Sequence, residues 1–187
     1  MKIGYQGDIG SNSEAAAKQY FEKNNDIEFV PLLSSEGVFQ ALMAGSIEVG
    51  VAAIRNSLAG EVQETKNALN KMNSSMPVCT ATVTLPIHHC LFSKIKNIQE
   101  CGVVMSHPQA LKQTKNTRER EFKWLSELEI GDQAKAAKDL SEGHYPENYA
   151  VICRKNAGEN VGLTLIAENI EDDPSNETTF GIFVKEK

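Results

Sequence analysis

The sequence has 187 residues, enough for one domain or for two small lobes that share a core. Hydrophobic residues make up 41% and charged residues 24%, which is ordinary for a soluble globular protein. Lysine and arginine number 19 against 25 acidic residues, and the net charge of −6 argues against a nucleic-acid-binding protein. No apolar run is long enough to span a membrane, and no signal-like run follows Met1, so we expect a cytoplasmic protein without membrane partners.

The cysteines are widely spaced, and no Cys-x-x-Cys pair occurs. This spacing predicts neither a zinc site nor a redox pair, and it fits reduced thiols in the cytoplasm. Cys79, Cys90 and Cys153 lie in apolar runs, so we expect them to fill core positions.

Apolar patterning predicts strands that alternate with helices. In chain order we expect a strand at 2–5, a helix at 13–23, a strand at 28–32, a helix at 35–44, a strand at 48–54, a helix at 61–72, a long strand at 78–92, a strand at 103–104, a helix at 112–125, strands and helices alternating at 128–130, 132–140, 149–153 and 155–160, and strands at 163–167 and 179–184. This order predicts an α/β fold of mostly parallel sheet with flanking helices.

The apolar run at 78–92 is too long for an ordinary strand. We interpret it as a strand that crosses between two lobes and bends near Pro86. The prediction is therefore a first lobe formed by residues 1–77 and 163–187, and a second lobe formed by residues 78–162.

Small polar side chains follow several predicted strands. Ser106 and Gln109 have the Ser-x-x-Gln spacing of a capping box, which predicts a helix start. The other polar turns contain Ser11 and Ser13, Arg55 with Asn56 and Ser57, Asp132 with Gln133, and residues 176–179. Open α/β sheets bind ligands at such turns, and helix N-termini favour carboxylates or phosphates.

These turns predict a cleft that accepts a small polar anion, with Arg55 as its candidate cation and no set of metal ligands. No Gly-x-Ser-x-Gly or Gly-x-Gly-x-x-Gly motif occurs, so neither a serine hydrolase nor a dinucleotide site is predicted. His88 and His89 are neighbours on a predicted strand and point to opposite faces, so we expect structural roles for both. The basic segment at 112–125 is expected to be a solvated helix face.

Five segments together resemble the catalytic domain of prephenate dehydratase, and the resemblance runs from end to end. They are residues 5–11 (YQGDIGS), 54–65 (IRNSLAGEVQET), 85–91 (LPIHHCL), 106–111 (SHPQAL) and 169–180 (NIEDDPSNETTF). The resemblance implies two lobes like those of type II periplasmic binding proteins, with the active site between them. It implies conversion of prephenate to phenylpyruvate, carbon dioxide and water in phenylalanine biosynthesis, without a cofactor or a metal.

By position, the resemblance implies that Thr178 donates a hydrogen bond to the leaving hydroxyl. Asn56 and Gln109 would be the other catalytic residues. The residues that would bind the substrate are Ser11, Arg55, Ser57, Ser106, Thr179 and Phe180. The resemblance also implies a homo-oligomer, a dimer or larger.

Four positions in three segments depart from the family pattern. The signature arginine is Thr179, the glutamate before Asn-Ser is Arg55, and Ser-Thr-Ala is Asp132-Gln133-Ala134. We hypothesise that Arg55 replaces the missing cation and binds a substrate carboxylate. The alternative is a paralogue that binds prephenate or another small carboxylate without dehydrating it: a sensor, an inactive homologue or a decarboxylase. Family members usually carry a regulatory ACT domain after the catalytic part; we expect none within these 187 residues, and both a natural lack of the domain and a shortened chain are compatible with the sequence.

Overall fold

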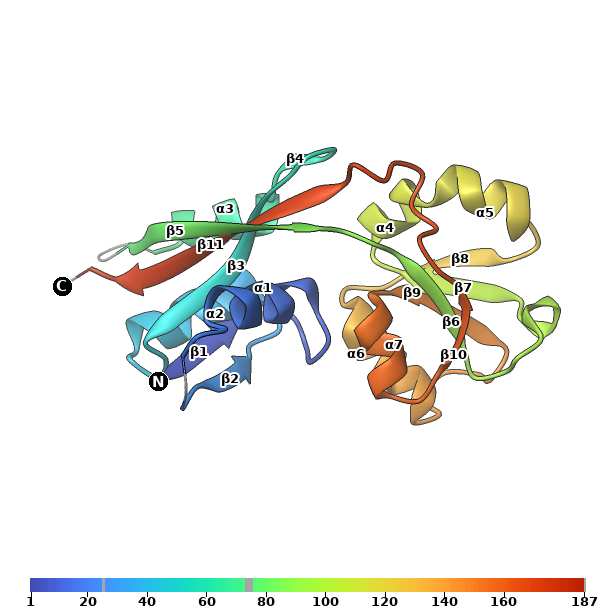
Figure 1. Ribbon diagram of the computed structural model, residues 1–187, viewed down its shortest axis with the longest axis horizontal. Coiled ribbons are helices and arrows are strands. Elements are labelled where there is room, and N and C mark those ends of the chain that lie inside the picture. The colour runs from blue at the N-terminus through green and yellow to red at the C-terminus, as the bar shows by residue number, and fades with distance from the viewer. Residues whose placement is uncertain (25, 73–75, 187) are drawn as a thin grey trace. The chain divides into compact units, whose positions relative to one another are not determined.

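The computed structural model describes residues 1–24, 26–72 and 76–186 (Figure 1). The first part of the chain contains β1 (Lys2–Tyr5), α1 (Asn12–Tyr20), β2 (Glu28–Pro31), α2 (Ser35–Met43), β3 (Val49–Asn56), β4 (Gly60–Glu61), α3 (Gln63–Asn70) and β5 (Pro77–Pro86). The second part contains β6 (Cys90–Ser93), the 3₁₀ turn η1 (Ile98–Glu100), β7 (Val103–Ser106), α4 (Pro108–Gln113), α5 (Lys115–Glu121), β8 (Ser126–Glu129), α6 (Gln133–Ser141), β9 (Tyr149–Cys153), α7 (Lys155–Asn160), β10 (Thr164–Ala167) and β11 (Glu177–Lys185). The predicted α/β class is confirmed. Among the described residues, no helix combines the length and the apolar character that a membrane span needs.

The chain divides into two compact units. Unit 1 is Met1–Pro86 with Glu177–Lys187, and unit 2 is Ile87–Asn176. The predicted lobe boundaries, after residues 77 and 162, lie earlier in the chain than the observed boundaries, which follow Pro86 and Asn176. The difference has a simple cause: β5 pairs along its whole length with β11 and stays in unit 1, whereas β10 pairs with β6 and stays in unit 2.

The sheet of unit 1 has the order β2-β1-β3-β11-β5, with β4 paired to β3. Helix α1 packs its alanines on one face against the strands, while α2 and α3 cover the other face (Figure 1). Side chains on both faces of these strands are therefore buried, which explains the nearly continuous apolar sequence of β3.

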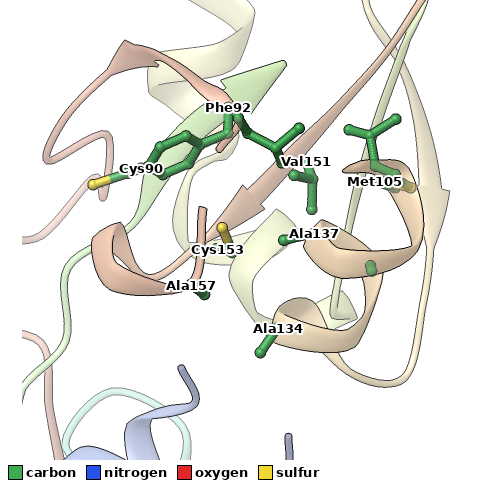
Figure 2. Close-up of a cluster of buried hydrophobic side chains, with 11 residues drawn as sticks. Cys90, Phe92, Met105, Ala134, Ala137, Val151, Cys153 and Ala157 are labelled. Carbon is green, nitrogen blue, oxygen red and sulfur yellow. The ribbon is translucent and has the colours of Figure 1, made fainter. Parts of the chain in front are cut away.

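The sheet of unit 2 has the order β10-β6-β9-β7-β8. Its core on the side of α6 and α7 combines small helical alanines with larger strand side chains, including Phe92, Met105 and Val151 (Figure 2). Leu111, Phe122 and Leu125, which lie in α4 or near α5, belong to the core on the other face.

Both sheets are mixed, and the expectation of mostly parallel strands is wrong. The pairs β1–β2, β1–β3, β7–β8 and β7–β9 are parallel. The long connections β5 and β11 run antiparallel to each other, and β6 runs antiparallel to both β9 and β10. The alternation of strands and helices does not reveal this, because it carries no information about chain direction.

The apolar run at 78–92 is two strands, β5 and β6, interrupted at residues 87–89. The interruption follows Pro86, as the predicted bend required, and it coincides with the boundary between the units. Proline lacks the backbone N–H that a continued ladder needs.

The basic segment at 112–125 is also two elements, α4 and α5, separated at Thr114. The prediction of a solvated face is wrong for Arg118, which is 5% exposed. Its guanidinium donates to the Leu111 carbonyl and to Glu127, and its Nε donates to Thr114 Oγ1. A buried arginine with these partners ties α4, α5 and β8 together.

The predicted capping box at Ser106 is wrong. The N-cap of α4 is His107, whose Nδ1 accepts from the Gln109 backbone N–H at 3.2 Å. Ser106 belongs to β7 and is fully buried. Ser11 and Asp132 are the N-caps of α1 and α6, and each side chain accepts a backbone N–H of its helix.

Cys90 and Cys153 fill core positions as predicted, whereas Cys79 is exposed on the edge strand β5. Burial raises the pKa of both core thiols, most strongly for Cys153. Their thiols therefore stay protonated and contribute packing.

Gly158 of α7 offers a test of this packing. A Cβ at this position would lie 2.5 Å from the Phe92 ring, so we expect Gly158→Ala to lower the free energy of unfolding by about 1–3 kcal/mol despite alanine's higher helix propensity. A Cβ at Gly131 would meet no atom within 4 Å beyond its chain neighbours, and Gly131→Ala should stay within about 0.5 kcal/mol of the parent. Urea unfolding of both variants measures the difference, and equal midpoints would contradict the packing.

Candidate active site

Asn56 and Thr178 lie 122 positions apart in the sequence and are hydrogen-bonded in unit 1. They are direct partners in the antiparallel pair β3–β11. The Asn56 Nδ2 donates to Thr178 Oγ1 at 2.9 Å, and both side chains are buried, with 3% and 8% exposed. Two of the three predicted catalytic residues are therefore in contact.

The surrounding bonds fix the orientation of the Asn56 amide. Its Nδ2 also donates to the Glu177 carbonyl at 3.0 Å, and its Oδ1 accepts from the backbone N–H groups of Leu58 and Ala59. A carbonyl can only accept and a backbone N–H can only donate, so the reverse orientation of the amide would lose these bonds. Asn56 is thus a donor to the threonine hydroxyl.

This donor determines what Thr178 can do. A hydroxyl has one hydrogen and two acceptor sites, and Asn56 uses an acceptor site. Within the described part of the chain, the Thr178 hydroxyl has no second hydrogen bond, so its hydrogen remains available to a ligand. The arrangement makes Thr178 a hydrogen-bond donor with a polarised O–H bond.

Ser57 supports the same strand pair. Its backbone N–H donates to the Glu177 carbonyl at 2.8 Å, and its hydroxyl accepts from the Glu177 N–H at 2.9 Å. These bonds place Ser57 beside the predicted site as a residue that holds β11.

The turn before α1 holds one of the chain's own carboxylates. Glu14 Oε2 accepts from the Gly10 N–H at 2.7 Å, and its other oxygen pairs with Lys18. Ser11 caps the helix and donates to the Gln6 carbonyl. The sequence prediction missed Glu14, although Ser11 and Glu14 have the Ser-x-x-Glu spacing of a capping box.

Arg55 and Thr179 lie on the sheet face opposite Asn56 and Thr178. The two residues are direct partners in β3–β11, and Arg55 also pairs with Glu61 of β4. Neighbouring residues of a strand point to opposite faces, so this row of side chains is separated from Thr178 by the sheet. Thr179 Oγ1 shares a hydrogen bond with Thr84 at 3.0 Å.

Phe180 lies in the core of unit 1 and is 1% exposed. Its ring is covered by protein atoms and packs in this core, and its contact with a substrate stays a prediction.

Ser106 and Gln133 are bonded to each other in unit 2. Ser106 donates to the Ile152 carbonyl at 2.9 Å, and Gln133 Nε2 donates to Ser106 Oγ at 2.8 Å and to the same carbonyl at 3.0 Å. The single hydroxyl hydrogen of Ser106 is therefore already used. Gln109 lies partly exposed in α4 of the same unit, and its convergence with Asn56 and Thr178 stays a prediction.

Among the described residues, one group of side chains could in principle hold a metal ion: Asp139, Glu142 and His144. Asp139 is paired with Lys135, whose ammonium occupies the position of a cation. The group lies at the end of α6, within unit 2.

Comparison with known proteins shows the family to which the chain belongs. The family model described as prephenate dehydratase matches residues 3–187. The chain belongs to the prephenate dehydratase family. An arogenate dehydratase/prephenate dehydratase 2 from Arabidopsis thaliana, named as chloroplastic, is 31% identical over 187 residues, which cover all of this chain and 47% of the relative. The chain thus spans about half the length of the curated relatives it matches.

Solved structures give the fold of the family. A prephenate dehydratase from Arthrobacter aurescens, in complex with L-Phe, has a TM-score of 0.84 at 21% identity and covers all of this chain and 61% of that one. A periplasmic substrate-binding protein of a Coxiella burnetii ABC transporter has a TM-score of 0.53 at 15% identity, with 100% and 84% covered. The predicted likeness to periplasmic binding proteins is confirmed at the level of the fold.

The strand register relates the departures at Arg55 and Thr179 to each other. In the family pattern a glutamate and an arginine occupy these two positions, and the register makes them direct cross-strand partners. A directly opposed pair of this kind stabilises a sheet when its charges differ. The exchange to arginine and threonine avoids two opposed cations on the face away from Thr178.

Arg55→Ala tests whether Arg55 binds a substrate carboxylate. From its place on the opposite face, we expect the affinity for prephenate to change by less than about threefold, measured by calorimetric titration. Loss of a charged partner of the ligand would instead cost about 2–5 kcal/mol. A loss of that size would contradict the cross-strand explanation and support the replacement cation.

His89 predicts a pH dependence of stability. It is 3% exposed, and burial lowers the pKa of its imidazole below the ordinary 6.5. The unfolded chain therefore binds a proton that the folded chain does not, and stability falls as the pH drops below about 6.5, by at most about 1.4 kcal/mol per pH unit. His89→Gln should remove this part of the slope in urea unfolding between pH 7 and 5, and an unchanged slope would contradict the assignment.

Proposed function

We propose that this chain converts prephenate to phenylpyruvate, releasing carbon dioxide and water. The observation that carries the proposal is the hydrogen bond from Asn56 to Thr178, which leaves the threonine hydrogen available to a leaving group. Support also comes from the family match over residues 3–187.

The reaction needs little from the protein. The ring carboxylate leaves as carbon dioxide, its bonding electrons enter the ring, and the ring hydroxyl leaves as water after taking up one proton. Aromatisation supplies the driving force. Thr178 would donate a hydrogen bond to the departing oxygen, and Asn56 would hold the threonine in the orientation that this donation requires.

The departures from the family pattern at Arg55 and Thr179 are compatible with this role. Both lie on the sheet face opposite Thr178, so the Asn56–Thr178 pair is undisturbed. The departure at Gln133 concerns Ser106, which belongs to unit 2. We therefore favour an active dehydratase over a binding protein that has lost the reaction.

Arogenate is the second candidate substrate, because the Arabidopsis relative is named for both activities. Arogenate carries an amino group where prephenate carries a keto group, and the ring chemistry is the same. The proposed role of Thr178 is identical for both, so turnover of each substrate has to be measured.

A homo-oligomer and a cytoplasmic location also stay predictions. Light scattering of the purified chain and fractionation of the source cells, respectively, measure them.

Thr178→Val tests the proposed donor. Valine has nearly the same shape and lacks the hydroxyl, so we expect the turnover number to fall by about 10²–10⁴-fold while the chain stays folded. Formation of phenylpyruvate from prephenate, followed by its absorbance at alkaline pH, measures the loss, and arogenate is assayed in parallel for phenylalanine.

Two further variants make this test specific. Asn56→Asp keeps an acceptor for Leu58 and Ala59 but removes both donor hydrogens, so it should also lower the turnover number strongly. Thr84→Val, a matched change on the opposite sheet face, should leave turnover within about twofold. Tight binding of prephenate without turnover in the parent protein would select the paralogue without dehydratase activity.

A further inference from the structure

Glu171 is a buried carboxylate outside the residues discussed so far. Its side chain is 2% exposed, and it lies in the irregular segment that precedes β11. Its Oε1 bonds His88 Nδ1 at 2.7 Å, and its Oε2 accepts from the His89 backbone N–H at 2.9 Å. One side chain thus joins two segments of unit 2. Residues 87–89 are the first that follow unit 1, and residues 170–176 are the last before the chain returns to it.

Backbone bonds join the same two segments on either side of Glu171. The Ile170 N–H donates to the His89 carbonyl at 2.9 Å, and the Ile87 N–H donates to the Asn176 carbonyl at 2.8 Å. The two segments therefore run side by side without forming a regular strand pair.

Amide side chains complete the connection to α4. Asn176 is fully buried, and its Nδ2 donates to Gln113 Oε1 at 3.1 Å. The same Gln113 oxygen bonds His89 Nε2 at 3.0 Å. We call Glu171, His88, His89, Gln113 and Asn176 the Glu171 network.

The network has an energetic cost that packing alone does not explain. Burial of a carboxylate is unfavourable unless hydrogen bonds or opposite charge offset it, and an apolar side chain would fill the same volume more cheaply. What the carboxylate provides is two directed bonds to consecutive residues, His88 and His89. These bonds fix the path of the chain into Asn176, and Thr178 follows two residues later.

We propose that Glu171 is a positioning residue for Thr178, an inference that rests on the proposed function. The pairing with β3 and β5 gives β11 its register, and the Glu171 network, by holding the segment 170–176 in one path, limits the movement of the start of β11, where Thr178 lies. Catalytic donors tolerate displacements of only about 0.5 Å, so a loosened segment lowers the rate before it unfolds the protein.

Glu171→Gln tests the proposal. The amide keeps its oxygen for the His89 backbone N–H and turns an N–H group toward His88 Nδ1, so the carboxylate charge is lost and the bond to His88 survives only in the tautomer that accepts at Nδ1. We expect the turnover number for prephenate to fall about tenfold while KM changes by less than about twofold, because Thr178 acts on the departing oxygen in the transition state. Amide hydrogen exchange of peptides that cover residues 176–180 should become faster.

Asp172→Asn is the matched control. Asp172 is the next residue, and its two oxygens accept from the backbone N–H groups of Asn116 and Thr117, at 2.9 Å each. This change should lower thermal stability through α5 while the turnover number and the exchange of residues 176–180 stay as in the parent. An equal loss of turnover in both variants would show a purely structural role and overturn the proposal, as would unchanged turnover in Glu171→Gln.

Two further measurements distinguish failure of this proposal from failure of the proposed function or of folding. If the parent protein does not turn over prephenate or arogenate, the proposed function fails, and the exchange comparison alone decides whether Glu171 fixes residues 176–180. If Glu171→Gln does not fold, His88→Ala removes one bond from the half-exposed side of the network, and we expect about a threefold loss of turnover. Unchanged turnover and unchanged exchange in His88→Ala would then overturn the proposal.

Discussion

The antiparallel pairing of β3 with β11 is the constraint on which the rest of the structure depends. It joins strands whose contacting residues Asn56 and Thr178 are 122 positions apart in the sequence, and it places β11 between β3 and β5. Without this pairing, unit 1 would lose the centre of its sheet. The same ladder of backbone bonds thus supports both the core and the hydrogen bond on which the proposed chemistry relies.

The two-residue repeat of a strand separates the altered positions of the family pattern from the Asn56–Thr178 pair. Thr178 and Thr179 are neighbours in the sequence but face opposite sides of the sheet, as do Asn56 and Arg55. One face of the strand pair holds the Thr178 hydroxyl. The other face holds the cross-strand pair of Arg55 and Thr179, where the family pattern has a glutamate and an arginine. A motif of adjacent residues is therefore two independent constraints, and only one of them concerns the reacting atoms.

Local signals made much of the fold predictable. The strand at 149–153 and the helix at 155–160 occur with the predicted bounds, since apolar runs and polar turns delimit them clearly. The predictions that failed depend on the contacts that the folded chain makes, whether the partners are distant or near in sequence. Ser106 has the local spacing of a cap but bonds the carbonyl of Ile152, and Arg118 lies in a basic run but is buried beside Glu127.

Part of the candidate site could also be predicted from the sequence. The family resemblance singled out Asn56 and Thr178, and the structure joins them. The Ser-x-x-Glu spacing of Ser11 and Glu14 could have indicated the bond of Glu14 at the turn before α1, but neither composition nor spacing could show that Phe180 would be covered by the core. Such outcomes depend on the three-dimensional neighbours of a residue, which a linear pattern leaves undetermined.

The position of β11 also has a consequence for synthesis on the ribosome. All of unit 2 lies between the two halves of unit 1 in the sequence, so its residues emerge as one uninterrupted stretch before β11 is made. The nascent chain can therefore complete unit 2 first, while β3 and β5 wait with exposed edges for the strand that belongs between them. Such late closure over a large sequence separation is slow, and it leaves the uncharged strand β5 in need of protection from aggregation until β11 has been made.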